Sequence, residues 1–333
     1  MIKYIGSKRL LIPQILEIAG RFEGVSTFCD LFSGTARVSI AFKKAGYSVH
    51  ANDCMAYAHT LAKTYVETDA DAIDSGSLAA SIARLNALAP VDGYFTRKFA
   101  REARYFQEEN ALRIDAIRGA IDSEPAMLRH LLLTSLILAA DRVDSTVGVQ
   151  MAYLKGWSER SFHAMELRPP ELVVGPGLAT QRDALEIAPE IDADLVYLDP
   201  PYNQHSYLGN YHVWESLVLN DSPETYGKAN KRIDCRTRPS PFNLKSQAKD
   251  ALEQVLFSLK SKRIILSFND EGYIPRSDLE SMLGRWGTYD CLAVPYRRHV
   301  GSKIGIYNLK GEKVGSPSYH GNREFLFFAQ GRS

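Results

Sequence analysis

The sequence has few cysteines, and they are widely separated. Its 333 residues include only Cys29, Cys54, Cys235 and Cys291, with no CxxC pair and no histidine cluster beside any of them. This spacing argues against a disulfide framework and against a structural zinc site. We therefore predict a protein without a metal, in a reducing compartment.

Long apolar segments are also missing. The longest strongly apolar run, residues 131–140, is about half the length that spans a bilayer. The N-terminal residues lack the apolar core of a signal peptide. These absences predict a soluble, cytoplasmic protein that does not associate with a membrane.

The chain shows no excess of charge of either sign, no internal repeat and no low-complexity segment. Forty Lys and Arg residues are balanced by 39 Asp and Glu residues, giving a formal net charge of +1. This balance neither requires nor excludes a nucleic-acid partner, so the distribution of charge along the chain must decide. The hydrophobic fraction of 45% is that of a globular chain, and the length suggests two structural units of about 150 residues.

The pattern that is present near the N-terminus is strand, loop, helix, strand, helix. We predict a strand at 27–29, a helix at 37–45 that Gly46 ends, and a second strand at 47–51. This is a βαβ unit, which begins a parallel sheet.

Residues 70–165 differ from this pattern because they have helical spacing. Helices are predicted at 78–88, 96–118 and 125–142, and strands resume at 195–198, 263–268 and 323–329. The sequence therefore predicts an α/β fold with one sheet domain, formed by 1–68 and 170–333. A helical insertion, 69–169, interrupts it.

Two predicted strand ends carry groups suited to a cofactor. The first strand runs into the loop Asp30–Gly34, and Asp53 follows the second strand. Such a loop places backbone N–H groups beside a ligand, and a carboxylate in the position of Asp53 accepts hydrogen bonds from ribose hydroxyls. The loop lacks GxGxxG, so an adenosyl ligand without phosphates fits better than a dinucleotide. The alternative is an ordinary turn with a helix-capping Asp53.

The tetrapeptide Asp199-Pro200-Pro201-Tyr202 follows a buried-strand pattern. Two prolines make a stiff bend that cannot extend the ladder of hydrogen bonds. Asp199 and the Pro200 carbonyl can accept the two protons of an amino group on a planar ring, while Tyr202 stacks on that ring. The alternative is a strand terminator followed by a helix cap.

These motifs, in this order, resemble those of Dam-like, alpha-group N6-adenine DNA methyltransferases of the restriction–modification type. The resemblance covers almost the whole chain and is weakest in the helical insertion. It is carried by residues 4–8, 30–34, 199–202, 203–212, 264–269 and 296–308.

The resemblance implies a Rossmann-like class I methyltransferase sheet with an inserted target-recognition subdomain, S-adenosylmethionine as cofactor and an adenine flipped out of double-stranded DNA as substrate. Asp199, Pro200 and Tyr202 would be catalytic, Asp53 would hold the ribose and Asp183 the adenine of the cofactor. The remaining expected cofactor contacts are Tyr4, Gly6, Lys8, Asp30, Phe32, Ser33, Gly34 and Asp199. Ser7 stands where many relatives have a second glycine, which puts the close backbone approach at this point in doubt.

Basic and aromatic side chains are candidates for DNA contact. Seven Lys or Arg residues between 226 and 249, Arg236 and Arg238 among them, predict a mobile basic loop beside the pocket. Surface charge alone is the alternative reading for this segment and for the others. The further candidates are Arg297 and Arg298, Arg142, Lys155, Arg160 and Arg168 of the insertion, and His205, Tyr207, Asn210 and Tyr211.

Other functions remain open from the sequence. N4-cytosine methylation uses a similar amine, RNA or protein methylation more often has Asn in the position of Asp199, and a catalytically silent DNA-binding module would keep the fold. A cognate restriction endonuclease would be a separate chain. No catalytic histidine or cysteine is expected, because a sulfonium methyl is already activated.

Overall fold

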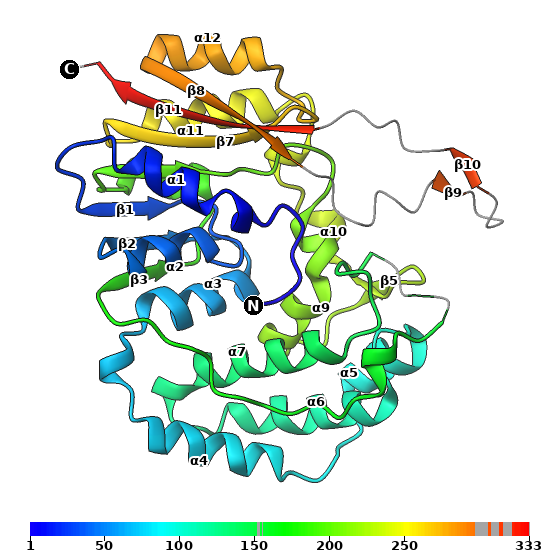
Figure 1. Ribbon diagram of the computed structural model, residues 1–333. Coiled ribbons are helices and arrows are strands. Elements are labelled where there is room, and N and C mark those ends of the chain that lie inside the picture. Colours follow the sequence, from blue (N-terminus) through cyan, green and yellow to red (C-terminus); the bar gives the residue numbers. More distant parts are fainter. Residues whose placement is uncertain (152–153, 155, 297–305, 308–312, 316–321, 333) are drawn as a thin grey trace.

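A seven-stranded sheet forms one half of the protein, which we describe from a computed structural model covering residues 1–151, 154, 156–296, 306–307, 313–315 and 322–332 (Figure 1). The strand order is β3-β2-β1-β4-β7-β11-β8. Five neighbouring strands are parallel: β3 (Gly177–Thr180), β2 (Ser48–Asn52), β1 (Thr27–Asp30), β4 (Leu195–Leu198) and β7 (Arg263–Asn269). β11 (Asn322–Gly331) runs antiparallel to both β7 and β8 (Gly287–Tyr296). The predicted α/β class and the mostly parallel sheet are confirmed.

Helices cover both faces of this sheet, which explains its apolar strands. All four residues of β4 are buried, as expected for a central strand of a parallel sheet. On one face α1 (Ile12–Ala19) and α2 (Arg37–Lys44) pack through side chains such as Ile15 and Phe42. On the other face lie α8 (Ala184–Ile187), α11 (Ala248–Ser258) and α12 (Arg276–Trp286).

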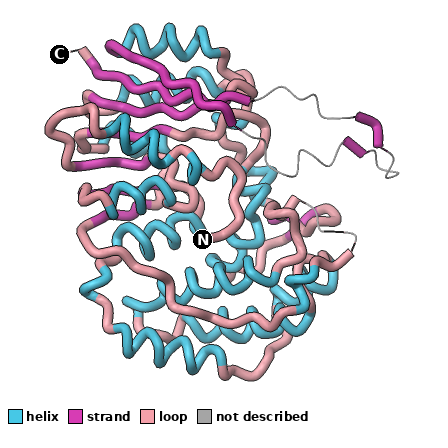
Figure 2. Tube along the Cα trace, in the orientation of Figure 1, coloured by secondary structure: helices cyan, strands magenta, loops and turns pink. Residues whose placement is uncertain are grey.

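The second half is helical, and most of it lies between β2 and β3 in the chain (Figure 2). It contains α3 (Ala56–Ala62), α4 (Ser75–Asn86), α5 (Tyr94–Thr96), α6 (Glu108–Ile121) and α7 (Ala126–Val143). Its hydrophobic core also includes Trp214 and Leu217 of α9 (Tyr207–Leu219), which follows the Asp-Pro-Pro-Tyr loop. The helical core therefore reaches beyond the predicted insertion 69–169.

One predicted helix is wrong. The expected helix 96–118 is interrupted after Glu102, where a π-helical turn ends, and α6 begins only at Glu108. The backbone N–H groups of Tyr105 and Phe106 bond back to the carbonyl of Phe99, and all three rings are buried. Burial of these rings fixes the bend, and acidic residues at the start of α6 favour a new helix there.

The shorter elements complete the described chain. They are β5 (Thr225–Tyr226), β6 (Lys231–Arg232), α10 (Asp234–Thr237), β9 (Ile306–Tyr307), β10 (Lys313–Gly315), the π-helical turns Lys63–Glu67 and Arg97–Glu102, and the 3-10 turns Lys8–Leu10, Ala70–Ala72, Glu159–Phe162, Ala188–Glu190 and Pro241–Asn243. The four cysteines are free thiols. No helix in the described ranges combines the length and apolar character needed to cross a membrane.

Candidate active site

A cavity opens at the carboxyl ends of β1, β2 and β4, with about 1010 Å³ of empty space that includes the solvent at its mouth. This edge is where parallel α/β sheets bind ligands. Every residue predicted to contact the cofactor lines it: Tyr4, Gly6, Lys8, Asp30, Phe32, Ser33, Gly34, Asp53, Asp183 and Asp199. The structure thus brings together groups from five separate segments of the sequence.

Gly34 and Asp53 join the ends of the first two strands. The N–H of Gly34 donates to Asp53 Oδ2 at 2.9 Å, and the N–H of Met55 donates to Oδ1 at 2.9 Å. Gly34 has a φ of +51°, and a Cβ there would lie 3.0 Å from the Tyr4 hydroxyl. The left-handed backbone conformation therefore favours glycine, and a Cβ would require Tyr4 to shift by a few tenths of an ångström.

Asp30 presents a buried carboxylate oxygen to this cavity. Its Oδ2 accepts a hydrogen bond from Ser39 Oγ at 2.6 Å, whereas Oδ1 has no partner among the described residues. Burial is the main reason that the pKa of Asp30 is raised to about 7. An unpartnered buried acceptor fits an amino group of a ligand.

The opposite wall of the cavity was only partly anticipated. Asp183 lines it and also caps α8, accepting a hydrogen bond from the N–H of Leu185 at 2.8 Å. Phe242 packs edge-on against Phe32, with 5.2 Å between ring centroids. Phe242, Ser240, Asn243 and Arg238 all line the cavity, and no sequence motif marked the first three.

The N-terminal motif is held by a stack of tyrosines. The ring of Tyr4 lies parallel to those of Tyr207 and Tyr211, at centroid distances of 5.3 and 4.6 Å. The N–H of Ile5 donates to the Tyr211 hydroxyl at 2.6 Å. Tyr211 is 1% exposed and supports Tyr4 in this structure, whereas its contact with DNA stays a prediction.

The Asp-Pro-Pro-Tyr loop lies between two cavities. Asp199 and Pro201 line the large cavity, and Pro200 between them is buried. Tyr202 lines a second cavity of about 290 Å³. Pro201 and Tyr207 line both, so the two cavities are neighbours.

The second cavity contains most of the predicted base-contacting rim. Besides Tyr202 it is lined by Ile5, Pro201, Asn203, His205, Tyr207 and Asn210. His205 is exposed, whereas Asn210 is 2% exposed and forms part of the inner wall. A planar ring in this cavity would lie beside the Tyr202 side chain and near the larger cavity.

Buried charges surround Asp199. Its Oδ1 is 3.1 Å from Lys8 Nζ, and Lys8 also pairs with Glu324. Burial, opposed by Lys8, raises the pKa of Asp199 to about 6. Glu324 was not predicted as a site residue, although an acidic residue inside the apolar run 323–329 is the signal that marks it.

The basic segment 226–249, predicted to be a loop, contains short regular elements. It folds into β5, β6, α10, a 3-10 turn and the start of α11. Arg232 is buried and pairs with Asp221 and Asp234, so it is not available to phosphate. Arg236 and Arg238 are exposed, and the Arg236 guanidinium lies 3.8 Å from the centre of the Tyr226 ring.

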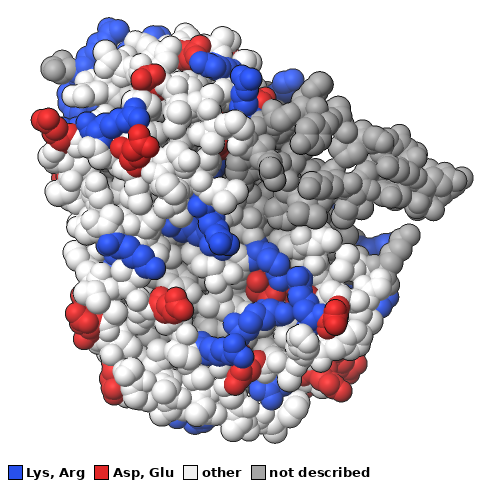
Figure 3. Space-filling view, viewed as in Figure 1, with Lys and Arg blue, Asp and Glu red and all other residues white. Residues whose placement is uncertain are grey.

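This segment is attached to the active-site loop. Asn243 Nδ2 donates to the carbonyls of Asn203 and His205, at 2.7 and 3.3 Å. In the view of Figure 3, Lys and Arg side chains gather along the middle of the face, between the sheet half and the helical half. Arg37 and Arg238 line the large cavity itself, so cationic side chains border it.

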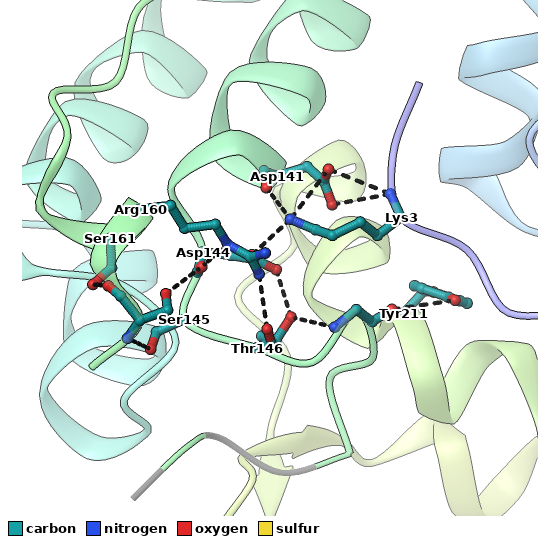
Figure 4. Close-up of polar contacts among 10 residues, drawn as sticks. Lys3, Asp141, Asp144, Ser145, Thr146, Arg160, Ser161 and Tyr211 are labelled. Atoms are coloured by element: carbon teal, nitrogen blue, oxygen red, sulfur yellow. Dashed lines mark hydrogen bonds and ion pairs between the residues drawn. The ribbon is translucent and has the colours of Figure 1, made fainter. Parts of the chain in front are cut away.

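The insertion is anchored to the N-terminus by an ion-pair network (Figure 4). Lys3 Nζ lies 3.4 Å from Asp141 and 3.0 Å from Asp144, and Asp144 also pairs with Arg160. Arg160 is thus a structural partner of a buried carboxylate.

The other basic candidates of the insertion are placed differently. Arg142 is exposed and donates to the Glu166 carbonyl at 2.6 Å, while Arg168 pairs with Glu166. Lys155, Arg297 and Arg298 lie outside the described residues. Within the described ranges, no group of three or more His, Cys, Asp or Glu side chains is arranged to hold a metal ion.

Known proteins share this sequence pattern. A family model described as D12 class N6 adenine-specific DNA methyltransferase matches residues 4–282. The modification methylase StsI of Streptococcus sanguinis is 32% identical over 92% of this chain and 51% of its own. The type II methyltransferase M.NlaIII of Neisseria lactamica is 31% identical over 93% of this chain and 96% of its own. The type II methyltransferase M.FokI of Planomicrobium okeanokoites is 30% identical over 89% of this chain and 49% of its own. The chain therefore spans about half the length of the first and third relatives and nearly all of the second.

Proposed function

Because the chain belongs to the D12 class N6 adenine-specific DNA methyltransferase family, we propose that it transfers a methyl group from S-adenosylmethionine to the N6 amine of an adenine in double-stranded DNA. One observation carries the proposal: Asp199 and Tyr202 lie in one loop, between a cavity lined by the residues expected to bind the cofactor and a smaller cavity beside it. The relatives are modification methylases, so the activity would protect DNA from a restriction endonuclease on a separate chain. A DNA substrate in turn favours a cytoplasmic enzyme.

The residues present fit the cofactor. The Asp30 carboxylate suits its amino group, Asp53 its ribose hydroxyls, and Phe32 with Phe242 the faces of its adenine. When bound, S-adenosylmethionine supplies a methyl group already activated by the sulfonium. Asp183 also lines the cavity and lies within reach of an adenine edge.

The protein's part in the reaction is to hold the acceptor amine. The ionised Asp199 carboxylate and the Pro200 carbonyl accept its two N–H protons, which leaves the nitrogen lone pair directed at the large cavity. Tyr202 stacks on the base. Formation of the C–N bond would break the methyl–sulfur bond of the sulfonium and leave S-adenosylhomocysteine. The nitrogen would give up one proton, for which the Asp199 carboxylate is the acceptor.

The acceptor adenine reaches the smaller cavity only after it flips out of the DNA duplex, at a cost of a few kcal/mol. Stacking on Tyr202 offsets part of that cost. Phosphate contacts from Arg236, Arg238 and Arg142 would add binding energy that depends on salt. We further propose that the helical insertion, which includes Lys155, reads the target sequence. Arg297 and Arg298 would also contact DNA.

Replacing Asp199 by Ala tests the function. Wild-type protein incubated with tritiated S-adenosylmethionine and unmethylated phage DNA should label N6-methyladenine, identified after digestion to nucleosides. Asp199→Ala should lower the transfer rate by at least about 10³-fold, since it removes the acceptor that orients the amine. Asp192→Ala, at an exposed aspartate seven residues earlier, is the matched control.

Three results would contradict the proposal. Label in N4-methylcytosine would indicate the other base, and label in RNA or protein would indicate another substrate class. DNA binding without transfer of label would indicate a catalytically silent module.

A further inference from the structure

A buried trio of charged residues lies behind the active-site loop. Lys8 Nζ is 3.1 Å from Asp199 Oδ1 and also contacts Glu324 Oε1. Lys8 and Glu324 are 5% and 1% exposed. Lys8 thus lies between two carboxylates that are far apart in the sequence.

Two neighbouring strands fix Glu324. On β11 it stands opposite Asn269 of β7. Its Oε1 accepts a hydrogen bond from Ser267 Oγ at 2.8 Å, and its Oε2 accepts one from Asn269 Nδ2 at 3.1 Å. Both carboxylate oxygens are therefore held by groups of the sheet, and the side chain has little freedom to move.

The Lys8 ammonium is fixed in turn by Glu324. Its side chain lies inside the protein, 5.9 Å from the centre of the Tyr202 ring, and Glu324 determines where its charge sits. Lys8 also pairs with Asp199 Oδ1. This contact fixes the orientation of the carboxylate, so its other oxygen, Oδ2, accepts a hydrogen bond from a defined direction.

We propose that Lys8 and Glu324 are positioning residues: Glu324 fixes the Lys8 ammonium, and Lys8 orients the Asp199 carboxylate and keeps it ionised for the acceptor amine. This inference rests on the proposed methyl transfer to adenine. It assigns to Glu324, in the distant strand β11, a role in the reaction although it does not touch the substrate. It also gives Lys8 a role beyond bordering the cofactor.

The signs of the electrostatic effects support this arrangement. Burial raises the pKa of Asp199, Lys8 lowers it and Glu324 raises it. The pKa of Glu324 is lowered, because the Lys8 cation and the hydrogen bonds from β7 outweigh burial. Asp199 also interacts electrostatically with three other titratable groups: Asp30 at the end of β1, Tyr197 of β4 and Tyr207 of α9. Tyr202 acts on Lys8. A single cation thus serves two carboxylates.

Opposite shifts of a pH profile would distinguish this role from a structural one. We would measure single-turnover methyl transfer to unmethylated phage DNA between pH 5 and 9, with saturating S-adenosylmethionine. Glu324→Gln removes the negative charge that competes for Lys8, so the acid limb should move to lower pH. Lys8→Met removes the cation, so the limb should move to higher pH. Each shift should be about one pH unit.

The plateau rates should also fall, by about tenfold for each variant, because the carboxylate is less firmly oriented. The KM for DNA should change by less than about threefold, since neither residue is proposed to bind it. Glu124→Gln is the control. Glu124 is 5% exposed and lies 3.2 Å from Arg84 Nε in the helical insertion, so its loss should leave the profile unchanged.

The outcomes separate the two proposals. If wild-type protein does not methylate adenine, the proposed function fails and this inference fails with it. If wild-type protein is active but the acid limb of Glu324→Gln stays in place or moves to higher pH, the positioning role alone is refuted. Circular dichroism identifies an unfolded variant. Should Lys8→Met not fold, the sign of the Glu324→Gln shift still decides.

Discussion

Replacing Asp30 by Asn should stabilise the cofactor-free protein at alkaline pH and weaken cofactor binding. Asp30 is 1% exposed, and one of its two carboxylate oxygens has a partner, Ser39 Oγ. Burial is the main cause that raises its pKa from 3.8 to about 7. Asn keeps an oxygen that can accept from Ser39 but carries no charge.

The size of the effect follows from proton linkage. The folded state holds the Asp30 proton more tightly than the unfolded state, so this carboxyl makes the folded protein less stable as the pH rises from about 4 to 7. With pKa values of about 7 folded and 3.8 unfolded, the cost should grow by about 3 kcal/mol between pH 5 and 8, at 1.36 kcal/mol per pH unit over the two units below pH 7. The Asp30→Asn variant would not show this loss.

Urea unfolding of both proteins at pH 5 and pH 8 measures this difference. The stability of Asp30→Asn relative to wild type should rise by about 3 kcal/mol between the two pH values. Calorimetric titration with S-adenosylhomocysteine, which carries the same amino group as the cofactor, should show at least about tenfold weaker binding to the variant. Asp192→Asn, at an exposed position, should change neither quantity.

Two results would refute the reasoning. If the relative stability of the variant does not change with pH, Asp30 is not the raised carboxyl that its burial implies. If the variant binds S-adenosylhomocysteine as tightly as wild type does, the unpartnered oxygen is not a ligand group.

Two further predictions concern the DNA side of the site. Tyr202→Ala should lower the transfer rate by about 10- to 100-fold, because stacking on one base contributes about 1–3 kcal/mol. The dissociation constant of the cofactor should change by less than about twofold, and equal losses in both quantities would contradict the stacking role. Replacing Arg236 and Arg238 together by Gln should make the plot of the logarithm of the DNA binding constant against the logarithm of salt concentration shallower by about 2, whereas Lys262→Gln, at an exposed position on the sheet half, should leave it unchanged. An unaltered slope in the double variant would exclude phosphate contact by that segment.

The cofactor side of the site could be predicted because its groups stand at the ends of strands. Asp30, Asp53 and Asp199 each follow or end a short apolar run. The carboxyl ends of parallel strands share one edge of the sheet, so these three groups had to meet there. Local sequence and one topological rule were sufficient for this part of the site.

The aromatic rim could not be assigned in the same way. Tyr207 and Tyr211 are four residues apart on α9, and their composition alone suits a DNA-contacting surface. Which tyrosine is buried depends on how α9 packs against α3 and the insertion, and therefore on tertiary contacts such as the hydrogen bond from Ile5 to Tyr211. Helical spacing gives the relative positions of side chains but not the side of the helix that faces the core.

Glu324 shows what sequence reasoning can and cannot supply for a buried charge. Because an unpaired carboxylate in the interior is costly, an acidic residue at the start of an apolar strand segment, as Glu324 stands before Phe325, predicts a partner. The identity of that partner depends on register: β11 lies between β7 and β8, and a shift of one residue would turn Glu324 to the opposite face of the sheet. Lys8 was equally uninformative alone, since its motif fits cofactor contact. Only the pairing of β11 with β7 brings the carboxylate and the ammonium together behind Asp199, so the support of the active-site loop is a property of the folded sheet rather than of either motif.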